Sequence, residues 1–331
     1  MDKGLLESVA SQLVAPTKGL LAADESTGTI TKRFETVGLT STPELNRKYR
    51  QMLFTTAGIE EFLSGIILFD ETAWQKTDDG VSFPEYLIKR GIAPGIKVDE
   101  GREALNVTEE LAKGLEGLAD RLKKYAAAGF KFTKWRAPFV INDIYPSKEA
   151  VSQNVQRMTE YAKVSQEEGL VPIVEPEVLL EGNHTTTRCG EVTVDILTAL
   201  FTALKEKQVN LKGLLLKTNM VLPGKDSGVK AAPLEVAQAT LRTVLKSVPQ
   251  EVPGIVFLSG GQSPEEATAN LNEINKLKKD APWELSFSFA RALQAEALDV
   301  WQGKDEDIGT AQAAFYRRAK SVSLARQGKY E

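Results

Sequence analysis

Charged side chains terminate several short apolar runs in this chain. GLLAAD (19–24) ends in an aspartate, and GLLLK (213–217) ends in a lysine after three leucines. In an α/β barrel, catalytic side chains come from the ends of several strands, so such residues are the first to consider for chemistry. The charged residues at or just after these runs are Asp24, Lys97, Asp99, Lys134, Arg136, Glu175, Glu177 and Lys217.

Lys217 has the setting that a nucleophilic amine requires. Its stem leaves an apolar run, so its ammonium group is poorly solvated unless a partner compensates. Desolvation and nearby cations such as Lys134 and Arg136 favour the neutral amine, which is the form that attacks a ketone to give a Schiff base. The alternative is a lysine that reaches solvent from a strand end.

Two pairs of charged residues are each spaced by two positions. Lys134 and Arg136 form one pair, and Glu175 and Glu177 form the other. This step places both members on one face of a strand, and in a barrel that face can point inward. The pairs fit acid–base catalysis, but they also fit a structural ion-pair network that fills the mouth of the barrel. The residues alone leave both readings open.

Three segments have the composition of phosphate-binding turns. FLSGGQS (257–263) leads from an apolar run through two glycines toward Pro264, and FSFARAL (287–293) adds a hydroxyl and a guanidinium group. ADESTGTITKR (23–33) offers hydroxyls and cations after the first run. Exposed backbone N–H groups at a helix start bind anions. The candidate residues are Ser259, Gly260, Gly261, Ser288 and Arg291 in the first two segments and Ser26, Thr29 and Arg33 in the third.

A metal-based route to carbonyl chemistry has little support. His184 is the only histidine and Cys189 the only cysteine, whereas a catalytic zinc takes about three protein ligands, usually including imidazoles. We therefore expect no metal site and no cofactor. His184 lies in the polar segment EGNHTTTRC and is expected at the surface, and Cys189 is expected to be a small buried side chain.

Composition is that of an ordinary globular protein. The 331 residues are 42% hydrophobic and 26% charged, with a formal net charge of -4. Basic residues do not form blocks, which argues against nucleic acid as a partner. We find no secretory signal at the N-terminus and no apolar segment of about 20 residues for a membrane span, so a cytoplasmic location is expected.

Apolar runs alternate with segments of helical spacing along the whole chain. Residues 109–129 and the stretch from Pro146 to Gly169 show helical periodicity, and 138–147 and 222–233 read as long loops. This alternation predicts a closed parallel (β/α)8 barrel, the TIM-barrel fold, with a doubly wound open sheet as the alternative. No linker divides the chain, so residues 1–331 are expected to form one domain. The eight predicted strands are 19–24, 65–69, 95–99, 130–135, 170–176, 213–217, 254–259 and 283–288.

The order of several long motifs is similar to that of the class I fructose-bisphosphate aldolases. The resemblance runs from about Leu5 to Tyr330 and rests on LLAADESTGTITKR, GIKVD, FTKWR, IVEPE, LLKTNMV, FLSGGQS and the RALQ stretch. It implies a lyase of glycolysis and gluconeogenesis that cleaves fructose 1,6-bisphosphate reversibly into dihydroxyacetone phosphate and glyceraldehyde 3-phosphate. A homotetramer, a phosphosugar substrate and independence of metal are also implied.

Residue roles follow from the same resemblance. Lys217 would form the iminium with C2 of the ketose, Glu175 would act as acid and base, and Asp24 would take the C4 hydroxyl proton. Lys134 and Glu177 would support charge and proton transfer, and Arg136 would contact the substrate. The C1 phosphate would meet Ser259, Gly260, Gly261, Ser288 and Arg291, and the other phosphate would meet Ser26, Thr29, Arg33 and Lys97.

The chain departs from the family pattern in three places. Thr29 stands where many relatives have serine, and Phe289-Ala290 replaces a tyrosine-glycine pair. Relatives also continue past the GKY motif into a tail whose terminal tyrosine assists enamine protonation, whereas this sequence ends at Glu331 and its Tyr330 belongs to GKY. Either another group protonates the enamine or the sequence omits a tail. A transaldolase, a single-phosphate aldolase and a barrel kept as a binding or scaffolding protein are the competing readings.

Overall fold

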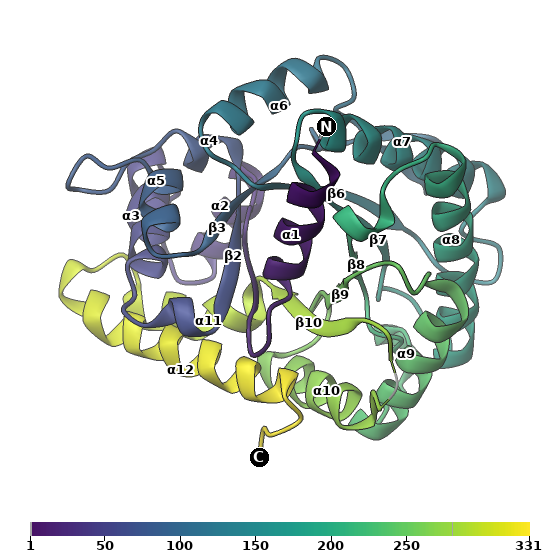
Figure 1. The fold of residues 1–331 in the computed structure, drawn as a ribbon. Helices are drawn as coiled ribbons and strands as arrows, with labels where there is room; N and C mark the ends of the chain where they lie inside the picture. Colours follow the sequence, from purple (N-terminus) through teal and green to yellow (C-terminus); the bar gives the residue numbers. More distant parts are fainter. Residues whose placement is uncertain (1, 280) are drawn as a thin grey trace.

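Eight parallel strands close into a barrel in the computed structural model, which describes residues 2–279 and 281–331. The strand order is β1-β10-β9-β8-β7-β6-β3-β2, and β1 pairs with both β2 and β10 (Figure 1). This closure confirms the (β/α)8 prediction over the open sheet. The strands are β1 (Gly19–Ala23), β2 (Leu63–Leu68), β3 (Ala93–Lys97), β6 (Phe132–Phe139), β7 (Val171–Val178), β8 (Leu215–Thr218), β9 (Gly254–Phe257) and β10 (Glu284–Phe289).

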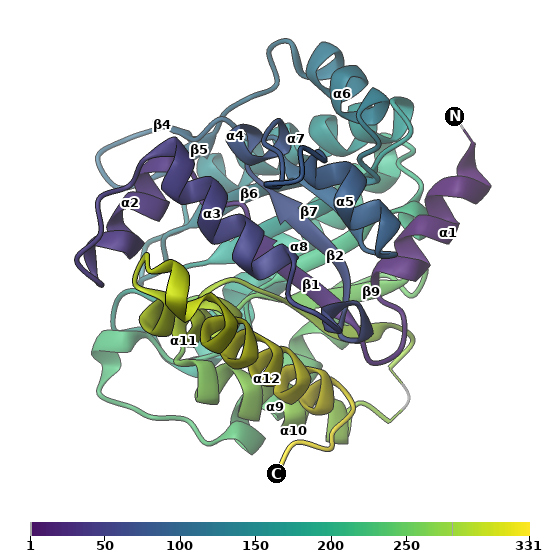
Figure 2. The ribbon, with the colours of Figure 1, turned by 90° about the vertical axis from the view of Figure 1, so that its left-hand side faces the viewer.

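Helices surround the barrel and close one of its ends. In Figure 2, α1 and α2 lie at opposite ends of the strands, with α1 at the N-terminal end. The helices are α1 (Lys3–Leu13), α2 (Thr27–Glu35), α3 (Pro43–Phe54), α4 (Asp70–Ala73), α5 (Phe83–Lys89), α6 (Leu118–Ala127), α7 (Lys148–Glu167), α8 (Thr186–Glu206), α9 (Pro233–Ser247), α10 (Pro264–Leu277), α11 (Arg291–Trp301) and α12 (Ile308–Arg326). Short 3-10 turns are η1 (Ile59–Glu61), η2 (Leu211–Gly213), η3 (Lys225–Ser227) and η4 (Asp305–Asp307).

Each of the eight apolar runs overlaps a barrel strand, but two details of the prediction were wrong. Strands β6 and β7 extend past their predicted ends at 135 and 176, because their ladder continues in register as far as Phe139 and Val178. Residues 109–129 are not one helix: α6 starts only at Leu118, and Glu110–Ala112 forms β5, which pairs antiparallel with β4 (Arg102–Ala104).

The inner face of the barrel changes from apolar to charged toward the C-terminal ends of the strands. Phe132, Ile173 and Leu215 belong to one buried cluster inside the barrel that also contains residues of α1. Side chains two positions apart share a strand face. The next inward positions on these three strands are therefore the charged residues Lys134, Glu175 and Lys217, so the apolar floor supports a charged layer.

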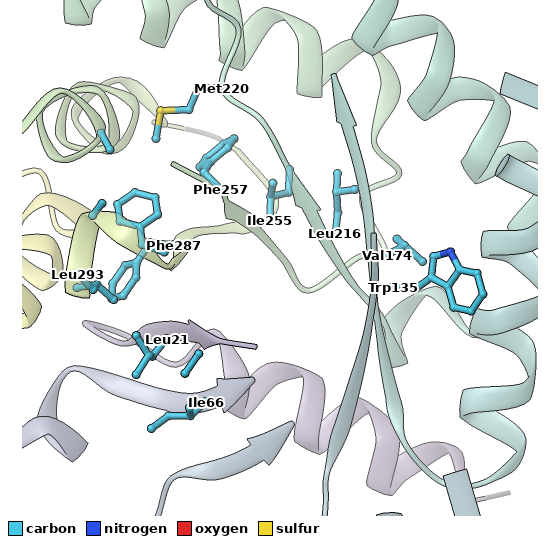
Figure 3. Packing of buried hydrophobic residues seen from close by; sticks show 14 of the residues in the cluster. Leu21, Ile66, Trp135, Val174, Leu216, Met220, Ile255, Phe257, Phe287 and Leu293 are labelled. Atoms are coloured by element: carbon cyan, nitrogen blue, oxygen red, sulfur yellow. The ribbon is translucent and has the colours of Figure 1, made fainter. Parts of the chain in front are cut away.

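The outer face of the strands carries the main hydrophobic core. Leu21, Ile66, Val174, Leu216 and Ile255 are fully buried in this second cluster, which fills the layer between strands and helices (Figure 3). The alternation along β8 is the clearest case, because Leu216 points outward while its two neighbours point inward. Burying one face against helices and the other inside the barrel fixes the strand register.

The N-terminal segment is held by parts of the chain that are distant in sequence. The Ser64 hydroxyl of β2 donates to the Leu13 carbonyl, and the Ser323 hydroxyl of α12 donates to the Thr17 carbonyl at 2.6 Å. Arg326, at the end of α12, donates to the Val14 carbonyl. Together with α1, these contacts close the N-terminal end of the barrel.

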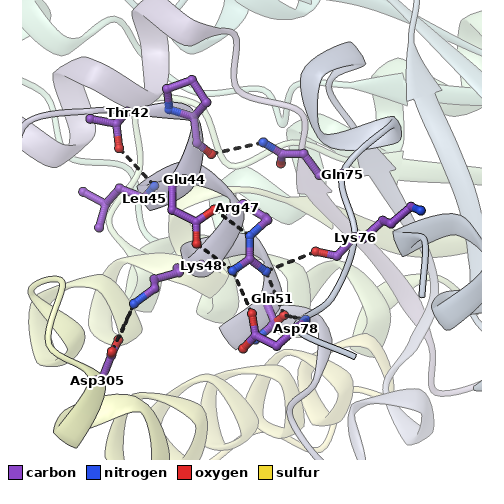
Figure 4. A network of polar contacts seen from close by, with 11 residues as sticks. Thr42, Glu44, Leu45, Arg47, Lys48, Gln51, Gln75, Lys76, Asp78 and Asp305 are labelled. Carbon is purple, nitrogen blue, oxygen red and sulfur yellow. Dashed lines mark hydrogen bonds and ion pairs between the residues drawn. The ribbon is translucent and has the colours of Figure 1, made fainter. Parts of the chain in front are cut away.

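A polar network ties α3 to the segments on either side of it (Figure 4). One Arg47 nitrogen contacts Glu44 and Asp78 at 2.7 Å each, and another donates to the Lys76 carbonyl at 3.1 Å. Lys48 pairs with Asp305 of η4 at 3.0 Å. A shared guanidinium group of this kind fixes geometry better than an isolated surface pair. The network therefore holds the helix that delivers Tyr49 and Arg50 toward the barrel mouth.

We expect Gly95→Ala to lower the free energy of unfolding by about 3 kcal/mol or more. A Cβ at this position of β3 would lie 2.2 Å from two ring atoms of Phe132. The ring fills the barrel floor and has no space into which to move, because interiors are close-packed. Denaturant unfolding followed by circular dichroism measures the change.

The matched control is Gly309→Ala, because a Cβ at Gly309 meets no atom within 4 Å. This variant should be as stable as the parent or slightly more so. Adding Phe132→Leu to Gly95→Ala should recover part of the loss, since the smaller side chain makes room. Equal stability of the two alanine variants would contradict the proposed packing.

No helix within residues 2–279 or 281–331 has the length and apolar character needed to cross a bilayer.

Candidate active site

A chain of alternating charges crosses the C-terminal mouth of the barrel. Asp24, just after β1, contacts the Lys134 ammonium at 2.5 Å, and Lys134 lies 3.2 Å from Glu175. The other oxygen of Glu175 lies 3.0 Å from the Lys217 ammonium. The four side chains are almost completely buried. Strand alternation brings them together, since all belong to the inward face of β6, β7 and β8 or follow β1.

Electrostatics keeps Asp24, Glu175 and Lys134 ionised. Burial acts to raise the pKa of Asp24, but attraction to Lys134 and Lys217 outweighs it and lowers the pKa to about 2. For Glu175 burial likewise acts upward, and Lys134, Lys217 and Arg136 lower its pKa below the usual range. Burial acts to lower the pKa of Lys134, yet the charges of Asp24 and Glu175 raise it well above the normal value. Lys134 is therefore a fixed cation shared by two carboxylates.

Each oxygen of Glu175 faces a different lysine. Within the described residues Oε2 accepts no hydrogen bond, so its 3.2 Å contact with Lys134 is coulombic rather than directional. Oε1 faces Lys217 at 3.0 Å, which is within the distance for direct proton transfer. Glu175 is thus placed to take a proton from the Lys217 ammonium and return it.

A second ion pair lies next to this chain on the same strand faces. Arg136 donates from Nε to Glu177, and its backbone N–H donates to Asp99 at 3.2 Å. Burial acts to lower the pKa of Arg136, but Glu177 raises it beyond the ordinary value. Because Glu177 neutralises Arg136, Lys134 is the cation that shares the Glu175 carboxylate with Lys217.

One wall of the cavity is built from the two turns after β9 and at β10. Ser288 is 1% exposed, lines the cavity, and its hydroxyl has no hydrogen-bond partner in the described part of the chain. Ser259 and Gly260 also line the cavity, and Arg291 begins α11. A buried hydroxyl without a partner costs free energy unless a ligand satisfies it. These groups therefore form an anion-suited wall.

Glycine is required at Gly261, although this residue does not line the cavity. Its φ is +79, and a Cβ there would lie 2.4 Å from the Leu180 side chain. The residue allows the chain to turn tightly behind Ser259 and Gly260 before α10 begins at Pro264. Its contribution is thus to the shape of the turn.

The opposite wall comes from the start of α2 and the end of β3. The hydroxyls of Ser26 and Thr29 lie 3.1 Å apart, and Lys97 contacts Asp99 at 2.6 Å. Arg33 stands apart from these three residues, because it pairs with Glu25 and lies 3.4 Å from Gln294 of α11. Arg33 therefore faces the Arg291 side of the cavity.

The structure gathers nearly all the predicted residues around one cavity of about 590 Å³. Only Gly261 among them is outside its lining. The predicted residues that line it are Asp24, Ser26, Thr29, Arg33, Lys97, Lys134, Arg136, Glu175, Glu177, Lys217, Ser259, Gly260, Ser288 and Arg291.

Sequence reasoning missed a buried network behind Arg33. Glu25 is 7% exposed and lies between Arg33 and Arg50, with Arg50 at 2.5 Å. The Tyr49 hydroxyl donates to Gln294 at 3.1 Å. Glu25 follows Asp24 directly, so its position in the sequence could have marked it as a site residue. Arg50 lies inside an amphipathic helix, where nothing in the sequence indicates that it is only 2% exposed.

The surface position predicted for His184 was wrong. The side chain is 5% exposed, because loop 222–228 covers it. The backbone N–H of Gly224 donates to the His184 carbonyl at 2.8 Å, and a Cβ at Gly224 would lie 2.9 Å from the imidazole. Burial lowers the pKa of His184. Cys189 is 1% exposed, as expected, and burial raises the pKa of its thiol to about 11.

Fold and cavity together define a (β/α)8-barrel protein with a buried lysine–carboxylate site. A family model described as fructose-bisphosphate aldolase class-I matches residues 5–331. The chain therefore belongs to the class I fructose-bisphosphate aldolase family, whose members are lyases.

Individual relatives agree over nearly the whole chain. "Fructose-bisphosphate aldolase 4, cytosolic" of Arabidopsis thaliana is 49% identical over 324 residues, which cover 97% of this chain and 82% of the relative. Fructose-bisphosphate aldolase C of Rattus norvegicus is 45% identical and is covered to 92% by the whole of this chain. A solved structure of the Plasmodium falciparum aldolase, in complex with TRAP and a small-molecule inhibitor, superimposes with a TM-score of 0.97 at 45% identity, covering 99% of this chain and 95% of that one.

Proposed function

We propose that this chain cleaves fructose 1,6-bisphosphate reversibly through a Schiff base on Lys217, without a metal. The observation that carries the proposal is the contact of 3.0 Å between Lys217 and Glu175, in a buried row of four acidic and basic residues that ends at Asp24. Glu175 removes the ammonium proton, and the resulting amine attacks C2 of the ketose. Loss of water from the carbinolamine, with Glu175 as the acid, then gives the iminium.

Cleavage uses Asp24, which lies at the other end of this row of charged residues. Asp24 takes the C4 hydroxyl proton, the C3–C4 bond breaks, and its electron pair moves into the iminium to form an enamine. Glyceraldehyde 3-phosphate leaves, and after protonation at C3 water releases dihydroxyacetone phosphate from Lys217. Lys134 and Glu177 hold the charges during these steps, and preorganised charges of this kind stabilise a transition state without rearranging.

The two walls of the cavity supply the phosphate sites in this proposal. Ser259, Gly260, Ser288 and Arg291 bind the C1 phosphate, with Gly261 shaping their turn. Ser26, Thr29, Lys97 and Arg33 serve the other phosphate, and Arg136 contacts the substrate between them. Arg33 would have to leave Glu25 and cross toward Lys97 to share that phosphate.

Borohydride trapping tests the Schiff base directly. Incubation with dihydroxyacetone phosphate and borohydride should add one reduced triose phosphate to Lys217, located by peptide mass spectrometry. The reaction should proceed equally after treatment with a strong chelator. An active enzyme whose Lys217 stays unmodified would overturn the mechanism, and loss of activity in chelator would overturn metal independence.

A single-phosphate ketose is the second candidate substrate. Lys97 is already neutralised by Asp99, with its Nζ 2.6 Å from both a carboxylate oxygen and the backbone carbonyl. Turnover of fructose 1,6-bisphosphate and fructose 1-phosphate should therefore be compared. Preference for the bisphosphate supports two phosphate sites, and equal turnover argues that the second wall does not bind phosphate.

The cellular setting is part of the same proposal. We infer one domain over residues 1–331, a homotetramer, a cytoplasmic location, and a place in glycolysis and gluconeogenesis. Support comes from the family and from relatives named cytosolic or cytoplasmic. Sedimentation analysis of the purified chain would decide the oligomeric state.

A further inference from the structure

A second cavity of about 850 Å³ opens beside the first, and the proposed reaction uses only the lining residues that the two cavities share. The two cavities share Ser26, Thr29, Lys97 and Arg136 as lining residues. The remaining walls come from α4, from the segment around β4, and from α6. Any ligand that fills this cavity would therefore meet residues that also line the catalytic cavity.

Trp74 provides a flat aromatic surface in the second cavity. Its side chain is 52% exposed, whereas Trp135, Trp283 and Trp301 are buried. One face stacks on Tyr125, with ring centroids 5.8 Å apart and an interplanar angle of 20°. Exposing a large aromatic side chain is unfavourable, so an exposed one beside a cavity is a candidate ligand contact.

Hydrogen bonds fix the orientation of this indole. Its N–H donates to Asp70 at 2.9 Å, and the Tyr125 hydroxyl donates to the same carboxylate oxygen at 2.7 Å. Both aromatic rings are thus anchored by one carboxylate, and the indole loses little conformational entropy when a second ring stacks on it. Such preorganisation strengthens binding.

The cavity is lined by more cations than carboxylates, but four of those cations already have carboxylate partners: Lys97 pairs with Asp99, Arg102 with Glu110, Arg121 with Glu100 and Arg136 with Glu177. Five cations and three carboxylates line it, and Asp70 is already engaged by Trp74 and Tyr125. Lys124 is exposed and forms no ion pair with the described residues. An exposed lysine without an ion-pair partner can attract an anion into the cleft. The five cations are Lys97, Arg102, Arg121, Lys124 and Arg136, and the carboxylates are Asp70, Asp99 and Glu100.

We propose that this cavity binds a nucleoside phosphate, with the base stacked on Trp74 and the phosphates on Lys124 and the shared residue Lys97. A planar ring on a rigid indole and an anion beside Lys124, which has no ion-pair partner among the described residues, are the two features that the cavity matches. Its volume is within the range of small-molecule sites. Because Lys97 is shared, the bound nucleotide competes with the bisphosphate substrate of the proposed function.

Calorimetry with ADP tests the proposal. ADP should bind the parent protein more tightly than ribose 5-phosphate, which lacks the base, and fructose 1,6-bisphosphate should displace it. Trp74→Ala should weaken ADP binding by at least about fivefold, the smallest loss expected for one stacked base, while Trp74→Phe keeps most of it. Lys124→Ala should also weaken ADP binding, and Lys320→Ala, at an exposed lysine outside the cavity, should not.

Equal binding of ADP and ribose 5-phosphate would overturn the proposal, as would unchanged ADP affinity in Trp74→Ala. Failure of fructose 1,6-bisphosphate to displace ADP would place the nucleotide elsewhere. Trp74→Ala should keep the far-ultraviolet circular dichroism of the parent. If it does not, the ADP affinity of Trp74→Phe is compared with that of the parent instead. ADP binding to the parent and to the Trp74 variants is measured without substrate, so a failed nucleotide site and a failed aldolase mechanism give different results.

Discussion

Replacing Lys217 with methionine should reduce cleavage of fructose 1,6-bisphosphate by at least about 10⁴-fold, which is the scale seen when an enzyme loses its nucleophile. Methionine has a similar length and fits the buried site, but it cannot form an iminium. Glu175 keeps Lys134 as a counter-ion at 3.2 Å, so the carboxylate is not left unpaired. A coupled assay of triose phosphate release measures the loss.

Two further variants separate chemistry from charge. Lys217→Arg keeps a cation beside Glu175 but provides no usable amine, so it should be as inactive as Lys217→Met. Lys212→Met, at an exposed lysine of η2, should retain the parent activity. Retention of more than about one part in a hundred of the activity in either Lys217 variant would contradict a Schiff base at this residue.

Lys134→Met should lower kcat/KM by about two to three orders of magnitude and move its acid limb to higher pH. Lys134 is the main favourable influence on the pKa of Asp24, which it helps hold near 2, and on that of Glu175. Burial raises the pKa of Asp24 and of Glu175, and without Lys134 this effect is opposed less strongly. Both pKa values therefore rise. Because the ionised carboxylates are the active forms, activity is then lost at a higher pH on acidification. A profile of kcat/KM against pH shows the shift.

The pKa of Asp24 also sets the direction in which folding stability changes with pH. The pKa of Asp24 is about 2 in the folded chain and 3.8 for the free group, so its ion pair stabilises the fold fully above pH 3.8 and the stabilisation is lost as pH falls toward 2. The stability difference between parent and Lys134→Met should therefore shrink below about pH 4. Lys131→Met, at an exposed lysine just before β6, is the matched control. An acid limb that does not move would refute the role assigned to Lys134.

Local patterns in the sequence predicted the barrel and most of the site. Three leucines before Lys217 set the alternation of β8, and the two-residue steps placed Lys134, Arg136, Glu175 and Glu177 on inward faces. These are short-range rules, and they hold because each strand is buried on both sides.

The remaining errors concern contacts between distant segments. Strands β6 and β7 continue past their predicted ends at 135 and 176 because cross-strand partners such as Arg136 and Glu175 lie side by side in the ladder. His184 is buried by a loop some 40 residues away. Arg50 sits in a helix that reads as amphipathic, and only the fold brings it to Glu25. Tertiary pairing overrides local pattern in each case.

Some contacts of the N-terminal segment can form only after nearly the whole chain has been synthesised, because they join it to the last strand and the last helix. Strand β1 needs β10 as a neighbour, and the segment after α1 is held by Ser323 and Arg326. A ribosome adds about 5–20 residues per second, so the first strand waits roughly 15–60 s for partners about 300 residues downstream. Until then the edge of β1 that pairs with β10 has no partner, and a chaperone that shields nascent chains would have most to protect at this end.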